Sequence, residues 1–217
     1  MTRADPPATP RPSQRLVWGW AALVLGLALA VKGGWLVAFD RGVTQWLDTL
    51  RTPSLDATAR ALTFFGGSPW ILGLAAVMGG WWWRLGRHRT MAACFLAGAC
   101  GLLLQLALRF LVSQWRPEAV VPEPMSLIAR YELAGFTSGH AFRSAFLYGW
   151  WADLLWRRKS AWAAAGAVGC WLLIVLMGLT RVYLHRHWCT DVVGAWLIAM
   201  TALAATARDR RQTPVRS

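Results

Sequence analysis

Acidic side chains are scarce in this chain, which has 10 Asp and Glu against 23 Lys and Arg in 217 residues. The few carboxylates form no cluster of the kind that holds Mg²⁺ or Ca²⁺. We therefore expect no bound metal and no cofactor. A function that depends on a carboxylate-rich metal site is excluded on the same ground.

Cysteine is also rare, and no pair has the C-x-x-C spacing of zinc or redox sites. The four cysteines stand in or beside apolar runs: Cys94, Cys100, Cys170 and Cys189. This placement is typical of small buried hydrophobic side chains. A disulfide framework and a zinc site are not expected.

Charged residues of all kinds make up only 15% of the chain, whereas 56% is hydrophobic and the mean hydropathy is +0.37. This composition is typical of a protein in a lipid bilayer. The net charge of +13 would also suit a nucleic-acid partner, but the basic residues lie in short clusters between apolar runs. Such clusters are typical of segments next to a membrane, and we expect no nucleic-acid binding.

Long apolar segments follow one another along most of the chain, and each approaches the roughly 20 residues that cross the hydrocarbon. They cover residues 16–39, 64–83, 90–112, 140–156, 161–179 and 188–207. The sequence therefore predicts an all-α polytopic membrane protein, with a six-transmembrane-helix bundle over residues 16–207. Residues 40–63 are amphipathic, which fits an interfacial helix and a simple connector equally well.

The basic residues define an orientation, because they gather at one side of a six-span bundle. They lie in the Pro-rich tail 1–15, the loops 84–89 and 157–159, and the basic tail 208–217. The positive-inside rule makes this side cytoplasmic. We expect a disordered first tail, both termini in the cytoplasm, and tryptophans at span ends serving as interfacial anchors.

Three polar segments stand at the opposite ends of the apolar segments. They read Arg109-x6-Arg116-Pro117, Thr137-Ser138-Gly139-His140 and Thr180-Arg181-x5-His187-x3-Asp191. Ionisable residues at membrane depth generally indicate function. The sequence thus predicts an extracytoplasmic site built from helix ends.

The last two segments contain the groups of a nucleophilic site. If a helix runs through His187 and Asp191, the carboxylate lies one turn from the imidazole and can hold one ring nitrogen, leaving the other free to attack. Ser138 and Gly139 precede an apolar run, so their amides would lie at a helix N-terminus, where anions bind. His140 would then stand beside the anion.

Arginines supply the positive charge. Arg109 and Arg116 are seven residues apart, two turns of a helix that Pro117 would end. With Arg181 they give three forked donors suited to a tetrahedral oxyanion. A single arginine is explained as well by snorkelling or loop capping, but three arginines beside two histidines and an aspartate favour a site.

The three segments resemble the motifs of the type 2 phosphatidic acid phosphatase (PAP2) superfamily, K-x6-RP, PSGH and SR-x5-H-x3-D, in order and in every spacing. Three positions depart from the pattern: Arg109 replaces Lys, Thr137 replaces Pro, and Thr180 replaces Ser. Arg109 keeps the charge and Thr180 keeps a hydroxyl. None of these changes removes a catalytic group.

This resemblance implies an integral-membrane lipid phosphatase without a metal. His187, oriented by Asp191, would form a phosphohistidine, while His140 would protonate the leaving group and then activate water. The phosphate oxygens would be bound by Arg109, Arg116, Arg181, Ser138 and Gly139. The implied substrate is a lipid phosphate or pyrophosphate of the undecaprenyl pyrophosphate, phosphatidic acid or phosphatidylglycerol phosphate type, and the implied location is the bacterial inner (plasma) membrane.

Two other functions are compatible with the sequence. A phosphotransferase of the same superfamily would pass the phosphoryl group to a lipid hydroxyl, and a non-catalytic protein would only bind anionic lipids. A transporter is disfavoured because no internal repeat is found. His185 is expected to be a spectator, the charges in loop 118–135 (Glu118, Glu123, Arg130 and Glu132) are expected to be solvated, and the oligomeric state is not predicted.

Overall fold

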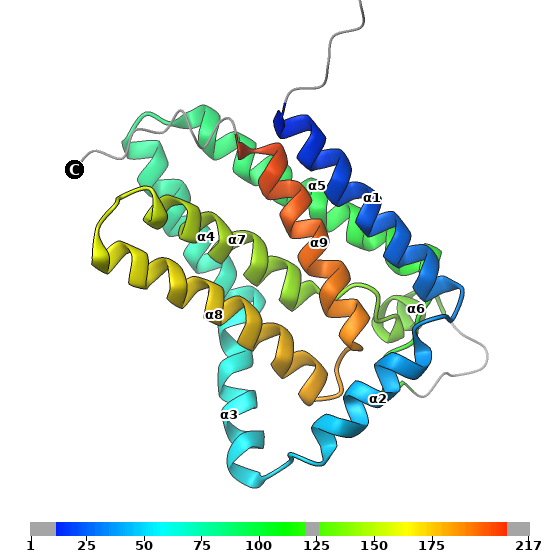
Figure 1. The fold of residues 1–217 in the computed structure, drawn as a ribbon. Helices are drawn as coiled ribbons and strands as arrows, with labels where there is room; N and C mark the ends of the chain where they lie inside the picture. Colours follow the sequence, from blue (N-terminus) through cyan, green and yellow to red (C-terminus); the bar gives the residue numbers. More distant parts are fainter. Residues whose placement is uncertain (1–11, 120–125, 208–217) are drawn as a thin grey trace, which may run out of the picture.

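A computed structural model describes residues 12–119 and 126–207, and these residues are organised as helices joined by turns (Figure 1). The helices are α1 (Pro12–Lys32), α2 (Val37–Asp48), α3 (Pro53–Thr63), the 3₁₀ turn η1 (Phe64–Gly66), α4 (Ser68–Arg84), α5 (His88–Val112), α6 (Leu127–Leu133), α7 (Gly139–Trp156), α8 (Ala161–Tyr183) and α9 (Cys189–Ala205). Within the described ranges there is no strand, only an isolated bridge between Trp115 and Ala134. The all-α prediction is confirmed.

The number of membrane crossings is only partly confirmed. Among the described residues, four helical stretches are long and apolar enough to cross a membrane: Gln14–Lys32, Pro53–Arg84, His88–Val112 and Ala161–Tyr183. Helix α9 is apolar but shorter. Helix α7 carries Arg143 and Asp153 along its length. Six crossings therefore remain a prediction.

The first predicted span, residues 16–39, differs from helix α1 at both ends. Helix α1 ends earlier, at Lys32, because the chain turns at Gly33 and Gly34, and Gly34 has a φ of +74° that favours glycine. It begins at Pro12, so residues 12–15 belong to α1 and not to a tail. The rest of the predicted disordered tail and all of the basic tail 208–217 lie outside the described residues.

The amphipathic segment 40–63 does not form a single helix. Pro53 occupies the first turn of α3, and the Thr52 hydroxyl accepts a hydrogen bond from the Leu55 amide at 3.2 Å. A proline at this position with a threonine N-cap starts a new helix. The segment is therefore divided between α2 and α3.

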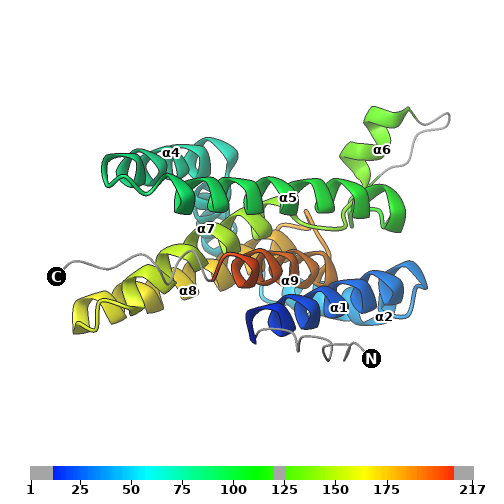
Figure 2. The ribbon, with the colours of Figure 1, turned by 90° about the horizontal axis from the view of Figure 1, so that it is seen from above.

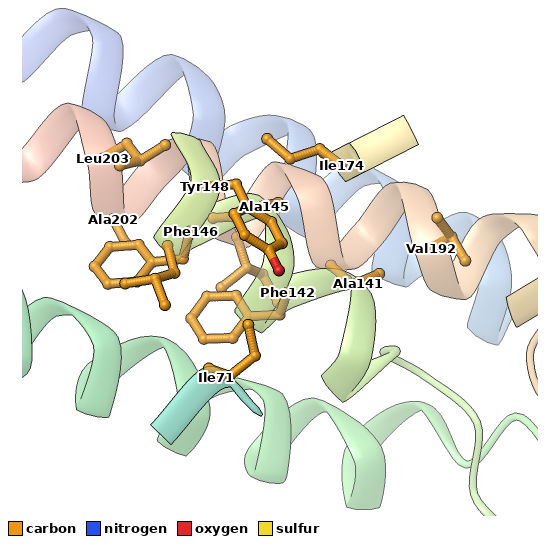
Figure 3. Close-up of a cluster of buried hydrophobic side chains, with 14 of the residues drawn as sticks. Ile71, Ala141, Phe142, Ala145, Phe146, Tyr148, Ile174, Val192, Ala202 and Leu203 are labelled. Atoms are coloured by element: carbon orange, nitrogen blue, oxygen red, sulfur yellow. The ribbon is translucent and has the colours of Figure 1, made fainter. Parts of the chain in front are cut away.

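Helix α7 lies at the centre of the fold and packs against α8 and α9, while α1 packs on the other side of α9 (Figures 1 and 2). Its Phe142 and Trp150 are almost completely buried. Figure 3 shows Phe142 and Phe146 of α7 in a cluster with Ile71 of α4, Ile174 of α8, and Val192 and Leu203 of α9. The core thus forms around α7.

Many large apolar side chains point away from this core, including Leu25 of α1, Leu72 of α4, Leu103 of α5 and Leu172 of α8. A soluble monomer rarely exposes so much apolar surface, whereas helices in lipid do so on their outer faces. The exposed faces indicate an integral membrane protein.

The two ends of the bundle carry different chemistry. The start of α1, the α4–α5 turn, the α7–α8 turn and the end of α9 lie toward one end in Figure 1. The C-terminal ends of α5 and α8, the N-terminal ends of α7 and α9, and helices α2 and α6 lie toward the other. The basic loops are thereby separated from the three polar segments, as predicted.

Close packing of α8 on α9 depends on a glycine. A Cβ added at Gly178 would lie against Trp196 and 2.7 Å from Cγ1 of Val192, whereas one at Gly169 meets nothing within 4 Å. We expect Gly178→Ala to destabilise the protein by about 1–3 kcal/mol through overpacking. Thermal unfolding in detergent would measure this, with Gly169→Ala on the same helix as the control. Equal melting temperatures for the two variants would contradict this packing.

Candidate active site

The first polar segment is helical only in part. Helix α5 ends at Val112, Ser113 adopts the left-handed conformation with φ 57°, and Trp115 then pairs with Ala134. The expectation that Arg109 and Arg116 lie two turns apart on one helix is therefore wrong. Arg109 lies on the last turn of α5, and Arg116 lies on the paired segment, where its amide donates to the Leu133 carbonyl at 3.0 Å.

The guanidinium of Arg109 joins α5 to the other side of the site. It donates to the carbonyls of Tyr131 at 3.4 Å and Thr137 at 3.2 Å, and it lies 4.7 Å from the centre of the Tyr131 ring. A planar fork can make such contacts and still present N–H groups elsewhere. Arginine at position 109 can therefore make structural contacts and still donate hydrogen bonds to a ligand.

Ser138 begins α7, as predicted. Its hydroxyl accepts a hydrogen bond from the Ala141 amide at 3.4 Å, and its own amide donates to the Asp191 carbonyl at 3.1 Å. The Ser138 amide is thus already engaged by the protein. The Ser138 hydroxyl proton and the Gly139 amide remain as donors for an anion at this helix N-terminus.

His187 lies in the turn before α9 and not on a helix. Helix α8 ends at Tyr183, His185 adopts φ 56°, and the amides of Arg186 and His187 both donate to the Arg181 carbonyl, at 3.0 and 3.1 Å. These bonds close the turn and fix His187 against the end of α8. A continuous helix through His187 and Asp191, the condition under which the sequence placed the two side chains one turn apart, is not present.

The contact between His187 and Asp191 nevertheless forms. Asp191 lies in the first turn of α9, and its Oδ2 accepts from the Trp188 amide at 3.0 Å and lies 3.3 Å from Nδ1 of His187. The Gly135 carbonyl lies 3.1 Å from the same Nδ1. Because a carbonyl can only accept, Nδ1 carries the proton and Nε2 keeps a lone pair.

The surroundings keep this imidazole neutral. His187 is 3% exposed. Burial, followed by the nearby charges of Arg181, Arg116 and Arg109, lowers the pKa of His187 well below its ordinary value. His187 is therefore unprotonated at neutral pH, as a nucleophile must be.

The remaining site residues lie around His187. His140, on the first turn of α7, interacts electrostatically with His187, Arg181 and Arg116. Arg181 is 9% exposed and donates to the Thr63 hydroxyl at 2.8 Å. The Nε atoms of Arg116 and Arg181 are buried without hydrogen-bond partners.

Within the described part of the chain, none of Arg109, Arg116 and Arg181 forms an ion pair with a carboxylate. Buried cations are normally paired. Three guanidiniums without such a partner among the described residues, close to one imidazole, are a set of donors that can bind an anion. The structure therefore brings the predicted residues of all three segments together.

The residues that were expected to be spectators lie outside this cluster. Nε2 of His185 is 2.7 Å from Asp48 on α2, and Glu118 lies 3.9 Å from the exposed Arg186. The loop between the first two segments contains the short helix α6, which was not predicted. Glu132 is exposed, whereas Glu123 and the side chain of Arg130 lie outside the described residues.

A buried carboxylate that the sequence did not single out supports the site from α2. Asp40 is 1% exposed and accepts from the amide and hydroxyl of Thr190, at 2.9 and 2.6 Å, and from Nε2 of Gln114 at 3.2 Å. The main-chain carbonyl of Gln114 in turn accepts a hydrogen bond from the Gly135 amide at 2.7 Å. Asp40 thus connects the first turn of α9 with the segment of Gly135, and both of these contact His187. No periodicity distinguishes it from the other acids of its amphipathic helix.

A neutral, oriented histidine that lies beside a second histidine and several arginines in an all-helical membrane protein is an arrangement that can bind and attack a phosphate group. The match to known families agrees: the PAP2 superfamily covers residues 89–213. This chain belongs to the PAP2 superfamily, and it is a membrane lipid phosphatase.

Two matches, one by sequence and one by structure, cover most of the chain. Phosphatidylglycerophosphatase B of Bacillus subtilis is 23% identical over 182 residues, which cover 80% of this chain and 84% of the relative. The crystal structure of a transmembrane PAP2-type phosphatidylglycerolphosphate phosphatase from Bacillus subtilis has a TM-score of 0.75 at 21% identity, covering 93% of this chain and 99% of that chain. At this identity the structural likeness concerns the fold.

Another solved structure is similar at a lower level. The crystal structure of LpxE from Aquifex aeolicus has a TM-score of 0.58 at 16% identity and covers 77% of this chain and 93% of that chain. The three PAP2-type motifs thus lie in a helical fold that solved phosphatases share.

Asp40→Ala tests whether α2 positions the site. The change leaves three buried donors without an acceptor, so we expect a lower melting temperature. We also expect a roughly tenfold or larger fall in kcat with little change in KM, because His187 is displaced while the phosphate site persists.

Asp40→Asn retains an acceptor for Thr190 and should recover part of kcat. The control is Asp48→Ala on the same helix, whose carboxylate is 40% exposed. A lower melting temperature with an unchanged kcat would mean that Asp40 stabilises the fold only.

Proposed function

We propose that this protein hydrolyses a phosphate ester or pyrophosphate on a lipid through a phosphohistidine at His187. The observation that supports this most directly is the environment of that imidazole. Its Nδ1 is held by Gly135 and Asp191, so its Nε2 keeps a lone pair, and Arg109, Arg116 and Arg181 lie close enough to act on it electrostatically without a carboxylate partner among the described residues.

In the first step, Nε2 of His187 attacks phosphorus as the bond to the leaving oxygen breaks, and His140 donates a proton to that oxygen. Negative charge on the phosphoryl oxygens is stabilised by Arg109, Arg116 and Arg181. The Ser138 hydroxyl and the Gly139 amide add hydrogen bonds.

In the second step, His140 accepts a proton from water, and the resulting hydroxide attacks the phosphohistidine. The phosphorus–nitrogen bond breaks, inorganic phosphate is released and His187 returns to its neutral form. Asp191 stabilises the positive charge that the imidazole carries while it is phosphorylated. The guanidiniums provide the charge that a metal ion supplies in other phosphatases, so the reaction needs none.

The substrate is a lipid whose tail stays in the bilayer while its headgroup reaches the helix ends. The names of the Bacillus relative and of the similar crystal structure favour a phosphatidylglycerol phosphate type of headgroup. The position of the site, away from the basic loops, supports an extracytoplasmic active site in the bacterial inner membrane with both termini in the cytoplasm.

The chemical test is phosphate release by purified protein in detergent with EDTA, on a panel of lipid phosphates and pyrophosphates. We expect turnover by the natural protein and a loss of at least about a thousandfold in His187→Ala. We also expect an acid-labile phosphoenzyme that His187→Ala does not form. His185→Ala is the matched control and should retain activity.

Turnover by His187→Ala equal to that of the natural protein would reject the nucleophile. Dependence on added metal would reject the metal-free reaction. Transfer of phosphate to a lipid hydroxyl in place of water would identify the phosphotransferase, and lipid binding without turnover would identify the non-catalytic alternative.

Orientation is tested with single cysteines introduced after replacing the native four. Arg186 is exposed near the site, and Arg158 is exposed at the other end of α7. In intact spheroplasts, a membrane-impermeant thiol reagent should label Arg186→Cys at once. Arg158→Cys should be labelled only after permeabilisation. The reverse pattern would place the site in the cytoplasm.

A further inference from the structure

A small polar pocket adjoins the phosphate site, between α5, α6 and α7. Its polar lining comes from Gln105, Arg109, Tyr131, Gly139 and Arg143. Arg109 and Gly139 belong to the predicted phosphate site, but Gln105 and Arg143 lie outside the three family motifs. The pocket therefore has donors that the proposed reaction does not use.

Arg143 is a fourth guanidinium at the site. It lies one turn after His140 on α7, and it interacts electrostatically with His140, Arg181 and Arg109. Its Nε is buried without a hydrogen-bond partner, and it forms no ion pair with a carboxylate in the described ranges. A cation placed among other cations is stable only beside an anion, and the described residues supply none to Arg143.

Gln105 adds a second unpaired donor. It lies one turn before Arg109 on α5 and is 5% exposed, and its Nε2 is buried without a partner. Buried amide donors are almost always satisfied in folded proteins, so an unsatisfied one that lines a pocket indicates a ligand oxygen.

Gly139 joins the pocket to the phosphate site. Its amide lies at the N-terminus of α7, while a Cβ at this residue would lie 3.1 Å from Nη1 of Arg143 and 4.0 Å from Oε1 of Gln105. Because glycine has no side chain, one lipid headgroup can contact both the phosphate site and the pocket of Arg143 and Gln105.

We propose that this pocket binds a second phosphoryl group of the same substrate headgroup, with Arg143 and Gln105 as its donors. The inference rests on the proposed function and narrows its substrate. The substrate would be a lipid with two phosphates, either a pyrophosphate or a terminal phosphate joined through glycerol to a phosphodiester. A lipid with one phosphate would leave Arg143 and Gln105 unpaired, and sites built for a polar group reject ligands that lack it.

The experiment compares kcat/KM for phosphatidic acid, phosphatidylglycerol phosphate and undecaprenyl pyrophosphate in the natural protein and Arg143→Ala. For at least one of the two lipids with two phosphates, we expect a fall of about 10- to 100-fold, mainly through KM. For phosphatidic acid the fall should be below about threefold. The lipid whose kcat/KM falls shows whether the two phosphates are joined directly, as in a pyrophosphate, or through glycerol.

Two variants control for charge and fold. Arg143→Lys keeps the charge without the fork and should recover part of the loss. Arg158→Ala removes a positive charge from the turn that follows the far end of α7 and should change none of the three kcat/KM values. An equal loss on all three lipids, or no loss on any, would overturn the proposal.

A binding measurement separates this inference from the proposed chemistry. In His187→Ala, we expect at least one of the lipids with two phosphates to bind about tenfold or more tightly than phosphatidic acid. Adding Arg143→Ala should abolish that preference. Equal binding of all three lipids by His187→Ala would reject the second subsite. Retained turnover by His187→Ala would reject the phosphohistidine, but it would not change what the binding measurement says about the second subsite.

Discussion

The site depends on how one imidazole is held. Nδ1 of His187 lies 3.1 Å from the Gly135 carbonyl and 3.3 Å from Asp191. Gly135 belongs to the segment before α7 and Asp191 to the first turn of α9, so the ring is fixed only when these two parts of the chain meet. Their meeting is itself hydrogen bonded, since the Ser138 amide donates to the Asp191 carbonyl. The same contacts therefore hold the fold together at this end and leave Nε2 of His187 free.

Positive charge is the second constraint. Arg109, Arg116, Arg143 and Arg181 come from α5, the segment after it, α7 and α8, and they repel one another in a region with little water. Such an arrangement is unfavourable unless an anion occupies it. Burial, followed by the charges of Arg181, Arg116 and Arg109, lowers the pKa of His187 and keeps its imidazole neutral. In the proposed reaction, Arg109, Arg116 and Arg181 would therefore both bind the phosphate and maintain the nucleophile.

Helices α2 and α3 lie outside the segment that matches the PAP2 superfamily, yet both contact the site. Asp40 of α2 bonds to Thr190 beside Asp191, and Thr63 of α3 accepts from Arg181. The amphipathic segment is therefore more than a connector. It holds the ends of α8 and α9 in place, close to where a lipid headgroup would enter.

The sequence by itself determined the membrane class, most of the apolar helices, and the residue types of the site, because a bilayer requires long apolar runs and the motif spacings are local. It did not determine where α5 ends, that His187 precedes α9, or that Asp40 and Arg143 face the site. Those features depend on the left-handed residues Ser113 and His185 and on contacts between segments up to 150 residues apart. Only the tertiary structure decides such contacts, because no local pattern records which distant donor meets a buried carboxylate.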